Sequence, residues 1–582
     1  MLLVLTYWSL GFVLSLFVWS KKLGREGIKS VLYKWLCVTP YLVILICIEN
    51  ILNGSKISYK VLDWLYVLDI PFVFEYNKLS SSMIILIELI STLVLWYISG
   101  YSFGDLGYVR LIGLVLGFKI SMLWLVMGSN LLSLFVGWEL VGIVSFGLII
   151  YWYTSMSNSK SAIQAMLMNK VGDICILLVL FILYKVLGGV EITLVFVYFE
   201  ENWMFLVYLM LLVGSFAKSG QIGLHFWLPN AMAAPTPISA LLHSATMVTA
   251  GVYLSIITGL SSKYLILIGS YSLLVLGSFG LIEYDYKRTI AYSTGSQLAY
   301  MFVGVGLGLY TLSFFHLLVH AVFKSTLFLS SGLVLYVCSD EQDIRSLGGL
   351  KSLVPLGYMA SVVGTLSILG FPFMGAYYSK EWLVLGSWLV DYDGWFLLVF
   401  GVLFTSYYSY RVFDRVYGGL TKLGKNVINE YSLESIPIYI VLFFMSQLVI
   451  YWGYLLTDIY NGLIWGNDTY IMSEFVGWLN DIMVGLMVIG IMLTVYLSKV
   501  WIYIMEKYYQ SWGFEVIYKN CLVKVYTWSD KTVWRLSDKG INEGLFIWGW
   551  WSVKKYKWYS HGLLYDYILL IILYGLVILW IL

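Results

Sequence analysis

The chain has 582 residues, of which 60% are hydrophobic and only 12% are charged, against about 25% charged residues in soluble proteins. With a mean hydropathy of +0.84, this composition excludes a soluble globular protein and predicts an all-α polytopic membrane protein. The net charge of +2 and the lack of a basic patch with base-stacking aromatics argue against nucleic acid as a partner. Five cysteines without a Cys-x-x-Cys pair predict neither a disulfide framework nor an iron–sulfur site.

Apolar stretches long enough to cross a bilayer recur along the chain, and we count about 16 of them. They lie near 1–20, 31–49, 79–99, 106–127, 130–152, 161–187, 203–226, 236–258, 263–283, 289–309, 311–337, 354–386, 394–412, 436–457, 480–504 and 563–582. The seventh, eighth and twelfth contain or adjoin prolines that predict interrupted helices, which lipid tolerates only where they line a cavity or pack within protein. These prolines are Pro229, Pro235, Pro237 and Pro372.

Basic residues concentrate in the odd-numbered loops. They are Lys21, Lys22, Arg25 and Lys29 after the first span, Lys287 and Arg288 after the ninth, and Arg415, Lys422 and Lys425 after the thirteenth. By the positive-inside rule, these loops face the side on which the protein is made. The first span begins at residue 1 and has no cleavage site, so we expect it to remain in the protein.

Residues 506–562 break the pattern of spans, because lysines and arginines alternate with aromatic and aliphatic residues. The run 523–536 predicts an amphipathic lateral helix at the membrane surface, on the positive side. A solvated loop is the alternative. Residues 563–582 then form a final transmembrane anchor.

Two proline-interrupted regions, each with a lysine nearby, indicate a weak internal repeat. Lys218 precedes Pro229, whereas Lys380 follows Pro372, as expected of two inverted five-helix repeats. The predicted organisation is 1–105 with the first three helices, 106–260 and 261–420 as the two repeats, 421–505 with helices 14 and 15, 506–562 and 563–582.

The most informative single residue is Lys218, which lies inside the apolar stretch 205–227. A lysine at mid-bilayer depth costs roughly 2.5–3.5 kcal/mol on insertion scales. Such a charge is retained where it is paired, faces water or moves ions or protons. Glu139, flanked by glycines in another span, is the expected partner, and the protonation states of the two groups would be coupled. A static ion pair is the alternative.

Other ionisable residues lie in neighbouring spans. Asp173 is expected to pair with Lys170 near a helix end, in a structural or a functional role. His243 lies about two turns into the eighth span, with Ser244 and Thr246 as possible hydrogen-bond neighbours. A lone buried histidine is usually a core residue, but the other titratable groups favour a relay role here.

A histidine and lysine stripe lies in the eleventh span. His316, His320 and Lys324 recur every four residues and so share one helix face. Imidazole titrates near neutral pH, which suits proton transfer through bound water. A zinc peptidase motif would need Glu where Leu317 stands, and a haem site would need paired histidines on facing helices. We therefore predict no metal site. In the twelfth span, Lys380 and Glu381 give a buried base beside an acid, or alternatively an interfacial salt bridge.

These motifs resemble subunit 5, in its mitochondrially encoded form, of the antiporter-like subunit family of proton-pumping NADH:ubiquinone oxidoreductase (respiratory complex I). The matching pieces are 135–146, 162–174, 218–251, 287–298, 316–332, 341–349 and 370–380. The resemblance covers about residues 80–420 well, and residues 512–544 resemble the region around the family's lateral helix. Phe226 departs from the family pattern, in which a proline follows the histidine.

The resemblance implies a proton-translocating subunit of an NADH:ubiquinone reductase, driven by redox chemistry in other subunits. It implies a relay of Glu139, Lys218, His243, His320, Lys324 and Lys380, with Asp173, His316 and Glu381 beside it. A charge shift at Glu139 would alter the hold on Lys218, and Lys380 would pass the proton to the far side.

The resemblance also implies where the chain works and with what. FMN, iron–sulfur clusters and ubiquinone would belong to partner subunits, and none to this chain. The expected partners are the other membrane-arm subunits, including the sister antiporter-like subunits, and lipids such as cardiolipin. The expected location is the mitochondrial inner membrane, with the lateral helix on the matrix side.

Two other functions fit part of the sequence. A subunit of a multisubunit Na⁺/H⁺ antiporter would share the spans around 106–412. A structural membrane-arm subunit with a decayed pump is the second alternative, against which the retained ionisable residues argue. The sister antiporter-like subunits lack a tail like residues 505–582.

Overall fold

The computed structural model describes most of the chain between residues 40 and 497. The described residues are 40–41, 43–54, 56–65, 70–102, 105, 107–192, 204–420, 422, 436–463, 476–497 and 524. The predicted spans 1–20 and 563–582 and nearly all of the lateral helix 523–536 lie outside this set, so they stay predictions.

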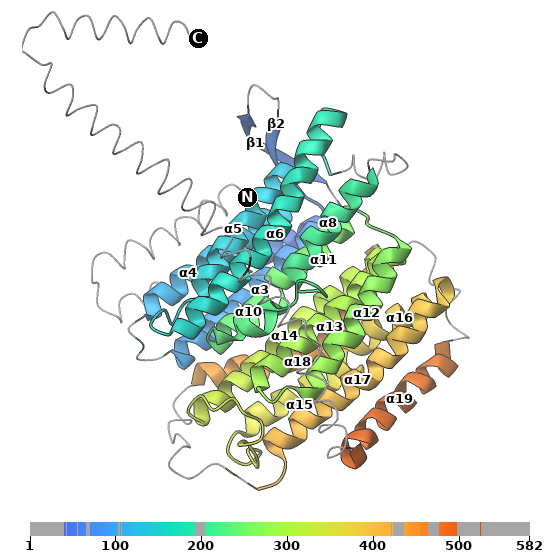
Figure 1. Cartoon of the computed structure of the whole chain (residues 1–582). Helices are drawn as coiled ribbons and strands as arrows, with labels where there is room; N and C mark the ends of the chain where they lie inside the picture. The colour runs from blue at the N-terminus through green and yellow to red at the C-terminus, as the bar shows by residue number, and fades with distance from the viewer. Residues whose placement is uncertain are drawn as a thin grey trace, which may run out of the picture. The chain divides into compact units, whose positions relative to one another are not determined.

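Helices dominate the described residues and run roughly parallel or antiparallel to one another (Figure 1). Their bounds are Val43–Asn53, α3 Lys78–Tyr101, α4 Tyr108–Met127, α5 Leu131–Ile149, α6 Met156–Leu187, α8 Met204–Ser219, α9 Trp227–Asn230, the 3₁₀ helix η2 Ala231–Ala233, α10 Thr236–Ser244, α11 Met247–Ile257, α12 Lys263–Ile282, α13 Tyr286–Gly306, α14 Tyr310–Val337, α15 Pro355–Leu369, α16 Gly375–Val390, α17 Tyr392–Tyr417, α18 Ile436–Leu463 and α19 Val476–Leu497. Among the described residues, nine helical segments are long and apolar enough to cross a membrane. The prediction of a helical polytopic membrane protein is confirmed.

The predicted interruptions are present at all three places. Helix α8 ends at Ser219, and Gly220 follows with a φ of +59°. A break at residues 245–246 separates α10 from α11. The single span predicted at 354–386 is two helices, α15 and α16, because Gly370 ends α15 in the left-handed region (φ +81°) and Pro372 follows in the connection.

A β-hairpin was not predicted from the sequence. Strand β1 (Ile57–Leu65) pairs antiparallel with β2 (Ile70–Tyr76), with Ile57 opposite Tyr76. The hairpin is held on the turn between α4 and α5, where the Ser129 amide donates to the Val73 carbonyl (3.2 Å). Phe72 and Phe74 pack edge-on against Trp124 with ring centroids 5.5 Å apart. It is therefore a packed part of the bundle.

The interior of the described bundle is formed by α10, α11, α13 and α14. The most apolar stretches of α10–α11 and of α14 are 94% and 100% buried, whereas that of α6 is only 39% buried. Helix α13 is buried along nearly its whole length although it is rich in Ser, Thr, Tyr and Gln. Polar side chains thus gather at the centre, and apolar ones such as Ile174 and Phe181 of α6 face outward.

The basic loops after the ninth and thirteenth predicted spans meet at one end of this bundle, whereas the loop after the first span lies outside the described residues. The Tyr286 amide donates to the Gln342 carbonyl (2.9 Å), and the Gly349 amide donates to the Gly418 carbonyl (2.9 Å). At the opposite end, the Leu131 amide donates to the Val190 carbonyl (2.9 Å). The side of the membrane that these loops face stays a prediction.

Candidate functional site

Lys218 lies in the last turn of α8 and is fully buried. Its Nζ donates to the Trp138 carbonyl of α5 (2.7 Å) and lies 5.0 Å from the centroid of the Trp138 ring. Gly142 makes room for the ammonium group, since a Cβ there would lie 3.4 Å from Nζ. The lysine is therefore held by a carbonyl and an aromatic face, both of which are neutral.

The expectation that Glu139 binds Lys218 directly is wrong. Glu139 forms its salt bridge with Lys170 of α6, and Lys170 also lies 3.4 Å from Asp173, as predicted. Asp173 accepts a hydrogen bond from the Trp138 indole N–H (2.8 Å). It lies in the middle of α6 rather than near a helix end. Lys218 still feels the charges of both carboxylates, so these side chains form one cluster.

His243 is buried in the last turn of α10. Neither of its ring nitrogens has a hydrogen-bond partner among the described residues. Its ring lies between Trp227 and Phe328, with centroid distances of 6.2 Å and 6.1 Å. The neighbouring hydroxyls are not its partners, because Ser244 and Thr246 donate to backbone carbonyls of the same helix.

The predicted stripe of His316, His320 and Lys324 is buried along α14. The two imidazole centroids are 6.5 Å apart. His316 Nδ1 shares a hydrogen bond of 2.9 Å with Ser379 Oγ of α16, and Lys324 Nζ donates to Ser293 Oγ of α13 (2.6 Å). The stripe therefore connects three helices.

His320 provides a link from this stripe to α10. It lies beside the backbone of Ser244, the residue after His243. Within the described part of the chain, neither ring nitrogen of His320 forms a hydrogen bond of ordinary geometry. The end of α10 and the middle of α14 thus bring two histidines into one neighbourhood.

Lys380 lies in α16 and points at the end of α15. Its Nζ donates to the Ile368 and Leu369 carbonyls (3.1 and 3.4 Å) and to Thr405 Oγ1 of α17 (3.2 Å). The last carbonyls of a helix lack intrahelical partners and carry partial negative charge, so a cation is stabilised there. The interruption between α15 and α16 creates this position. The adjacent Glu381 interacts with Tyr377, one turn before it.

Lys218, Lys324 and Lys380 share one property. Each is at most 1% exposed, and none forms a salt bridge with a carboxylate among the described residues. Lys380 also lies close enough to Lys324 and His316 for their positive charges to repel. All the predicted site residues except Glu139, whose side chain is 25% exposed, are thus buried in the interior.

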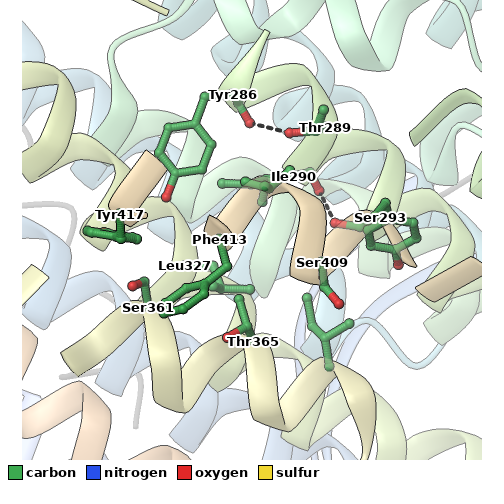
Figure 2. A pocket seen from close by; sticks show the side chains of 13 residues that line it. Tyr286, Thr289, Ile290, Ser293, Leu327, Ser361, Thr365, Ser409, Phe413 and Tyr417 are labelled. Carbon is green, nitrogen blue, oxygen red and sulfur yellow. Dashed lines mark hydrogen bonds between the residues drawn. The ribbon is translucent and has the colours of Figure 1, made fainter. Parts of the chain in front are cut away.

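A small cavity adjoins these residues (Figure 2). Its volume is about 30 Å³, enough for one or two water molecules when each needs roughly 10–15 Å³. Figure 2 shows hydroxyl groups of α13, α15 and α17 around it, with Ser293 at one end and Tyr286 and Tyr417 at the other. Because Ser293 is the partner of Lys324, the cavity extends from Lys324 toward the end of the bundle that carries the basic loops.

Several residues of this site were not predicted. They are Trp138, Ser293, Ser379 and Thr405, together with the salt bridge between Lys170 and Glu139. Hydroxyl groups give no sequence signal, because they look like ordinary residues of a polar helix face. A second unpredicted feature is the buried ion pair of Glu88 and Lys119, whose signal was one charged residue near the middle of each of two apolar stretches.

Within the described residues, no group of three or more His, Cys, Asp or Glu side chains is placed to hold a metal ion. The chemistry that these residues offer is acid–base chemistry. Lysines, imidazoles and carboxylates in a dry interior can each exist with or without a proton, at a cost set by their neighbours.

Comparison with known proteins supports the helical membrane-protein fold described above. Residues 128–407 match the family model described as "NADH:quinone oxidoreductase/Mrp antiporter, TM". The chain is similar in structure to the Mrp complex from Dietzia sp. (TM-score 0.70, 20% identity, covering 91% of this chain and 63% of that chain). It is also similar to the membrane-bound sulfane sulfur reductase, an archaeal respiratory membrane complex (TM-score 0.66, 20% identity, 84% and 99% coverage).

Curated relatives give a narrower answer. The chain is 38% identical over 461 residues to NADH-ubiquinone oxidoreductase chain 5 from Acanthamoeba castellanii, covering 74% of this chain and 67% of the relative. It is 37% identical over 477 residues to the protein of the same name from Rhizopus stolonifer, covering 78% and 72%. This chain is therefore a member of the NADH-ubiquinone oxidoreductase chain 5 family.

Proposed function

We propose that this chain moves protons across the membrane along the axis from Lys218 through His243, His320 and Lys324 to Lys380. Its family makes it an antiporter-like subunit of the H⁺-translocating NADH:ubiquinone oxidoreductase. The observation that carries the proposal is that all three axis lysines have neutral partners. A buried lysine held by a carboxylate keeps its proton, whereas one held by carbonyls and hydroxyls can release it at a smaller electrostatic cost.

The cluster of Glu139, Lys170 and Asp173 would act as the control of Lys218. Lys170 is shared between the two carboxylates. If a proton arrives at Glu139, Lys170 shifts toward Asp173 and neutralises it. Lys218 then has less negative charge nearby and releases its proton more readily.

Transfer along the axis would run through water between the side chains. Neither ring nitrogen of His243 has a hydrogen-bond partner among the described residues, so a bridging water can reach it, and His320 lies beside the Ser244 backbone that follows His243. Repulsion between Lys324 and Lys380 would prevent both from carrying a charge at once. Loading one lysine would therefore discharge the other.

The cavity beside Ser293 has a mostly apolar surface with several hydroxyl-bearing residues in its lining, and we infer that it could form part of a proton path between Lys324 and the end with the basic loops. Ser293, Thr289 and Tyr286 line the cavity along α13 (Figure 2). Waters hydrogen-bonded to such hydroxyls conduct protons without any side chain having to ionise. Such a path would give Lys324 access to one surface, separate from Lys218.

The other parts of the proposal concern the surroundings of the chain. Redox chemistry would take place on partner subunits that hold the flavin, iron–sulfur clusters and ubiquinone, and the membrane would be the mitochondrial inner membrane. The exposed apolar face of α6, with Ile163, Leu167, Ile174 and Phe181, supports contact with lipid acyl chains, cardiolipin among them, or with a sister subunit.

The test is the Lys218→Met variant in the assembled complex. Loss of a positioned proton-transfer group commonly costs about 10²–10⁴-fold in rate. We therefore expect the rate of coupled proton pumping to fall at least about 100-fold while assembly stays intact. Proton uptake and NADH oxidation are measured in sealed vesicles, with assembly followed on native gels. Lys185→Met is the matched control, because Lys185 is an exposed lysine at the end of α6. Normal pumping by assembled Lys218→Met complex would refute the proposal.

A further inference from the structure

One pair of opposite charges lies in the interior outside this axis. Lys119 Nζ of α4 is 2.5 Å from Glu88 Oε2 of α3, and both side chains are 0% exposed. Glu88 is the eleventh residue of α3 and Lys119 the twelfth of α4. Both therefore lie near the middle of a membrane-spanning helix, where charges are most costly.

Stability does not explain this pair. Taking two charges out of water costs more than their attraction returns unless further hydrogen bonds satisfy the remaining atoms. Beyond the contact with Lys119, neither carboxylate oxygen of Glu88 has a hydrogen-bond partner among the described residues. A well-packed apolar pair would hold α3 to α4 at least as well. The pair is thus a candidate for function.

The packing of α4 on α5 places this pair level with the Lys218 cluster. A Cβ on Gly137 would lie 2.5 Å from the Leu125 amide nitrogen, and one on Gly147 would lie 3.2 Å from Leu114 Cδ2. These two contacts fix the antiparallel register. Lys119 lies about midway between Leu114 and Leu125 along α4. Gly142 likewise lies midway between Gly137 and Gly147 along α5. Lys119 is therefore at the height of Gly142.

Gly142 is also the residue of α5 that Lys218 Nζ approaches from the other side. One helix thus separates Lys119 from Lys218 at the same depth. Lys119 belongs to α4, which packs against α5, whereas Glu88 belongs to α3, one helix further from the Lys218 cluster.

We propose that Glu88 and Lys119 are a further proton-exchanging pair that sets the charge state of Lys218 from the α3–α4 side. The step is internal: an N–H bond of the Lys119 ammonium breaks, an O–H bond forms on the Glu88 carboxylate, and an amine and a carboxylic acid result. No other reactant is needed and the net charge does not change. The positive charge on α4 disappears, so Lys218 holds its proton more firmly. Both residues act through Lys218 and are positioning residues.

This inference rests on the proposed function, and Lys119→Arg tests it most sharply. Arginine keeps the positive charge and the salt bridge but does not give up its proton in proteins. We expect the complex to assemble and oxidise NADH while the ratio of protons pumped to NADH oxidised falls. An unchanged ratio would show that the pair is static and would overturn the inference.

A second variant covers the possibility that arginine does not fit. Glu88→Gln combined with Lys119→Met leaves no buried charge, so it separates packing from proton exchange. Ser91→Ala and Ser121→Ala are matched controls, because these buried hydroxyls beside the pair donate only to their own helix backbone. A lowered ratio in the assembled double variant supports the inference. A normal ratio, or failure of both pair variants to assemble while the serine controls assemble, assigns the pair a structural role and overturns it.

The same measurements on Lys218→Met distinguish the two proposals. If Lys218→Met loses pumping while Lys119→Arg keeps the normal ratio of protons pumped to NADH oxidised, only the role of the Glu88–Lys119 pair is refuted. Normal pumping in Lys218→Met refutes the proposed axis itself.

Discussion

At the scale of single residues, the partners of a lysine within the bundle decide what it can do. Lys119 and Lys170 contact carboxylates, whereas Lys218, Lys324 and Lys380 contact carbonyls, hydroxyls and aromatic faces. All five were visible in the sequence as charges in apolar stretches. Their partners were not, because a backbone carbonyl 80 residues away, such as that of Trp138 for Lys218, leaves no local pattern.

The same limit explains the wrong pairing of Glu139. Glycines on both sides of Glu139 correctly indicated a close approach between helices. Two cations, Lys170 and Lys218, lie in that neighbourhood, and opposite charge alone does not choose between them. The choice depends on the rotation of α6 against α5, which places Lys170 on Glu139 and leaves Lys218 over the Trp138 ring.

One residue-scale prediction concerns pH and the loop between α14 and α15. Arg345 donates to both carboxylate oxygens of Asp343 (2.7–3.1 Å), and these bonds lower the pKa of Asp343 below its usual value. A lowered pKa in the folded state means that the stabilisation is fully present above the usual aspartate pKa of about 3.9. It is lost as the pH falls through the lowered value.

We therefore expect the Ile344 amide, which donates to the Tyr284 carbonyl, to lose protection from hydrogen exchange only below that pH. Hydrogen exchange of the intact complex, read by mass spectrometry on peptides from this loop, measures it. Asp343→Asn should remove this pH-dependent loss of protection, because the asparagine side chain does not titrate. A loss that persists in Asp343→Asn would assign the pH dependence to another group.

At the scale of elements, helix interruptions place the functional lysines. The prolines predicted which spans are interrupted, since Pro cannot continue a helix. They did not predict where α10 ends, because the break at Ala245 and Thr246 contains no proline. What the interruptions build was not predictable: the free carbonyls at the end of α15 become ligands of Lys380 from the next helix. The hairpin of β1 and β2 was missed because it lies between hydrophobic stretches and its strands pack on a turn, Ser129 and Asn130, more than 50 residues away.

The element-scale prediction concerns the contact between α8 and α11. Gly251 lies against α8, and a Cβ there would be 2.2 Å from the Ser215 carbonyl oxygen, one turn before Lys218. Gly251→Ala must therefore push the two helices apart, because the obstacle is backbone and cannot rotate away. Overpacking of this kind typically costs about 1–3 kcal/mol.

We expect less assembled Gly251→Ala complex and a lower midpoint of thermal unfolding. Native gels and a thermal denaturation series measure both. Gly485→Ala is the control, because a Cβ at Gly485 of α19 would meet nothing within 4 Å. Equal stability of the two variants would show that the α8–α11 contact relaxes without cost.

At the scale of the whole molecule, the described bundle has two chemically different ends. Lys287, Arg288, Arg345, Lys351 and Lys422 lie at the end to which the cavity beside Ser293 extends. The loop before α12, with Ser262 and Lys263, lies at the other. The concentration of basic residues in the odd-numbered loops predicted two chemically different ends. The helix packing explains the difference, since each crossing helix reverses the end at which the chain emerges.

The charge bias predicts which end faces the compartment where the chain is made. We expect Lys351→Cys to react with a membrane-impermeant maleimide from the matrix side, and Lys263→Cys from the opposite side. Both positions are exposed lysines in the wild-type chain, so the two variants control for each other. Cys338 adds little background, because it is buried and burial raises the pKa of its thiol to about 11, while the thiolate is the reactive form.

The comparison of sealed inverted vesicles with vesicles of native orientation measures which end is labelled. Reversed labelling would place the cavity beside Ser293 at the membrane side opposite to the one on which the chain is made. Labelling of both positions from one side would contradict the odd number of crossings between Lys263 and Lys351 (α12, α13 and α14). The orientation thus decides the direction in which the axis lysines can be loaded, and no residue-scale measurement supplies that information.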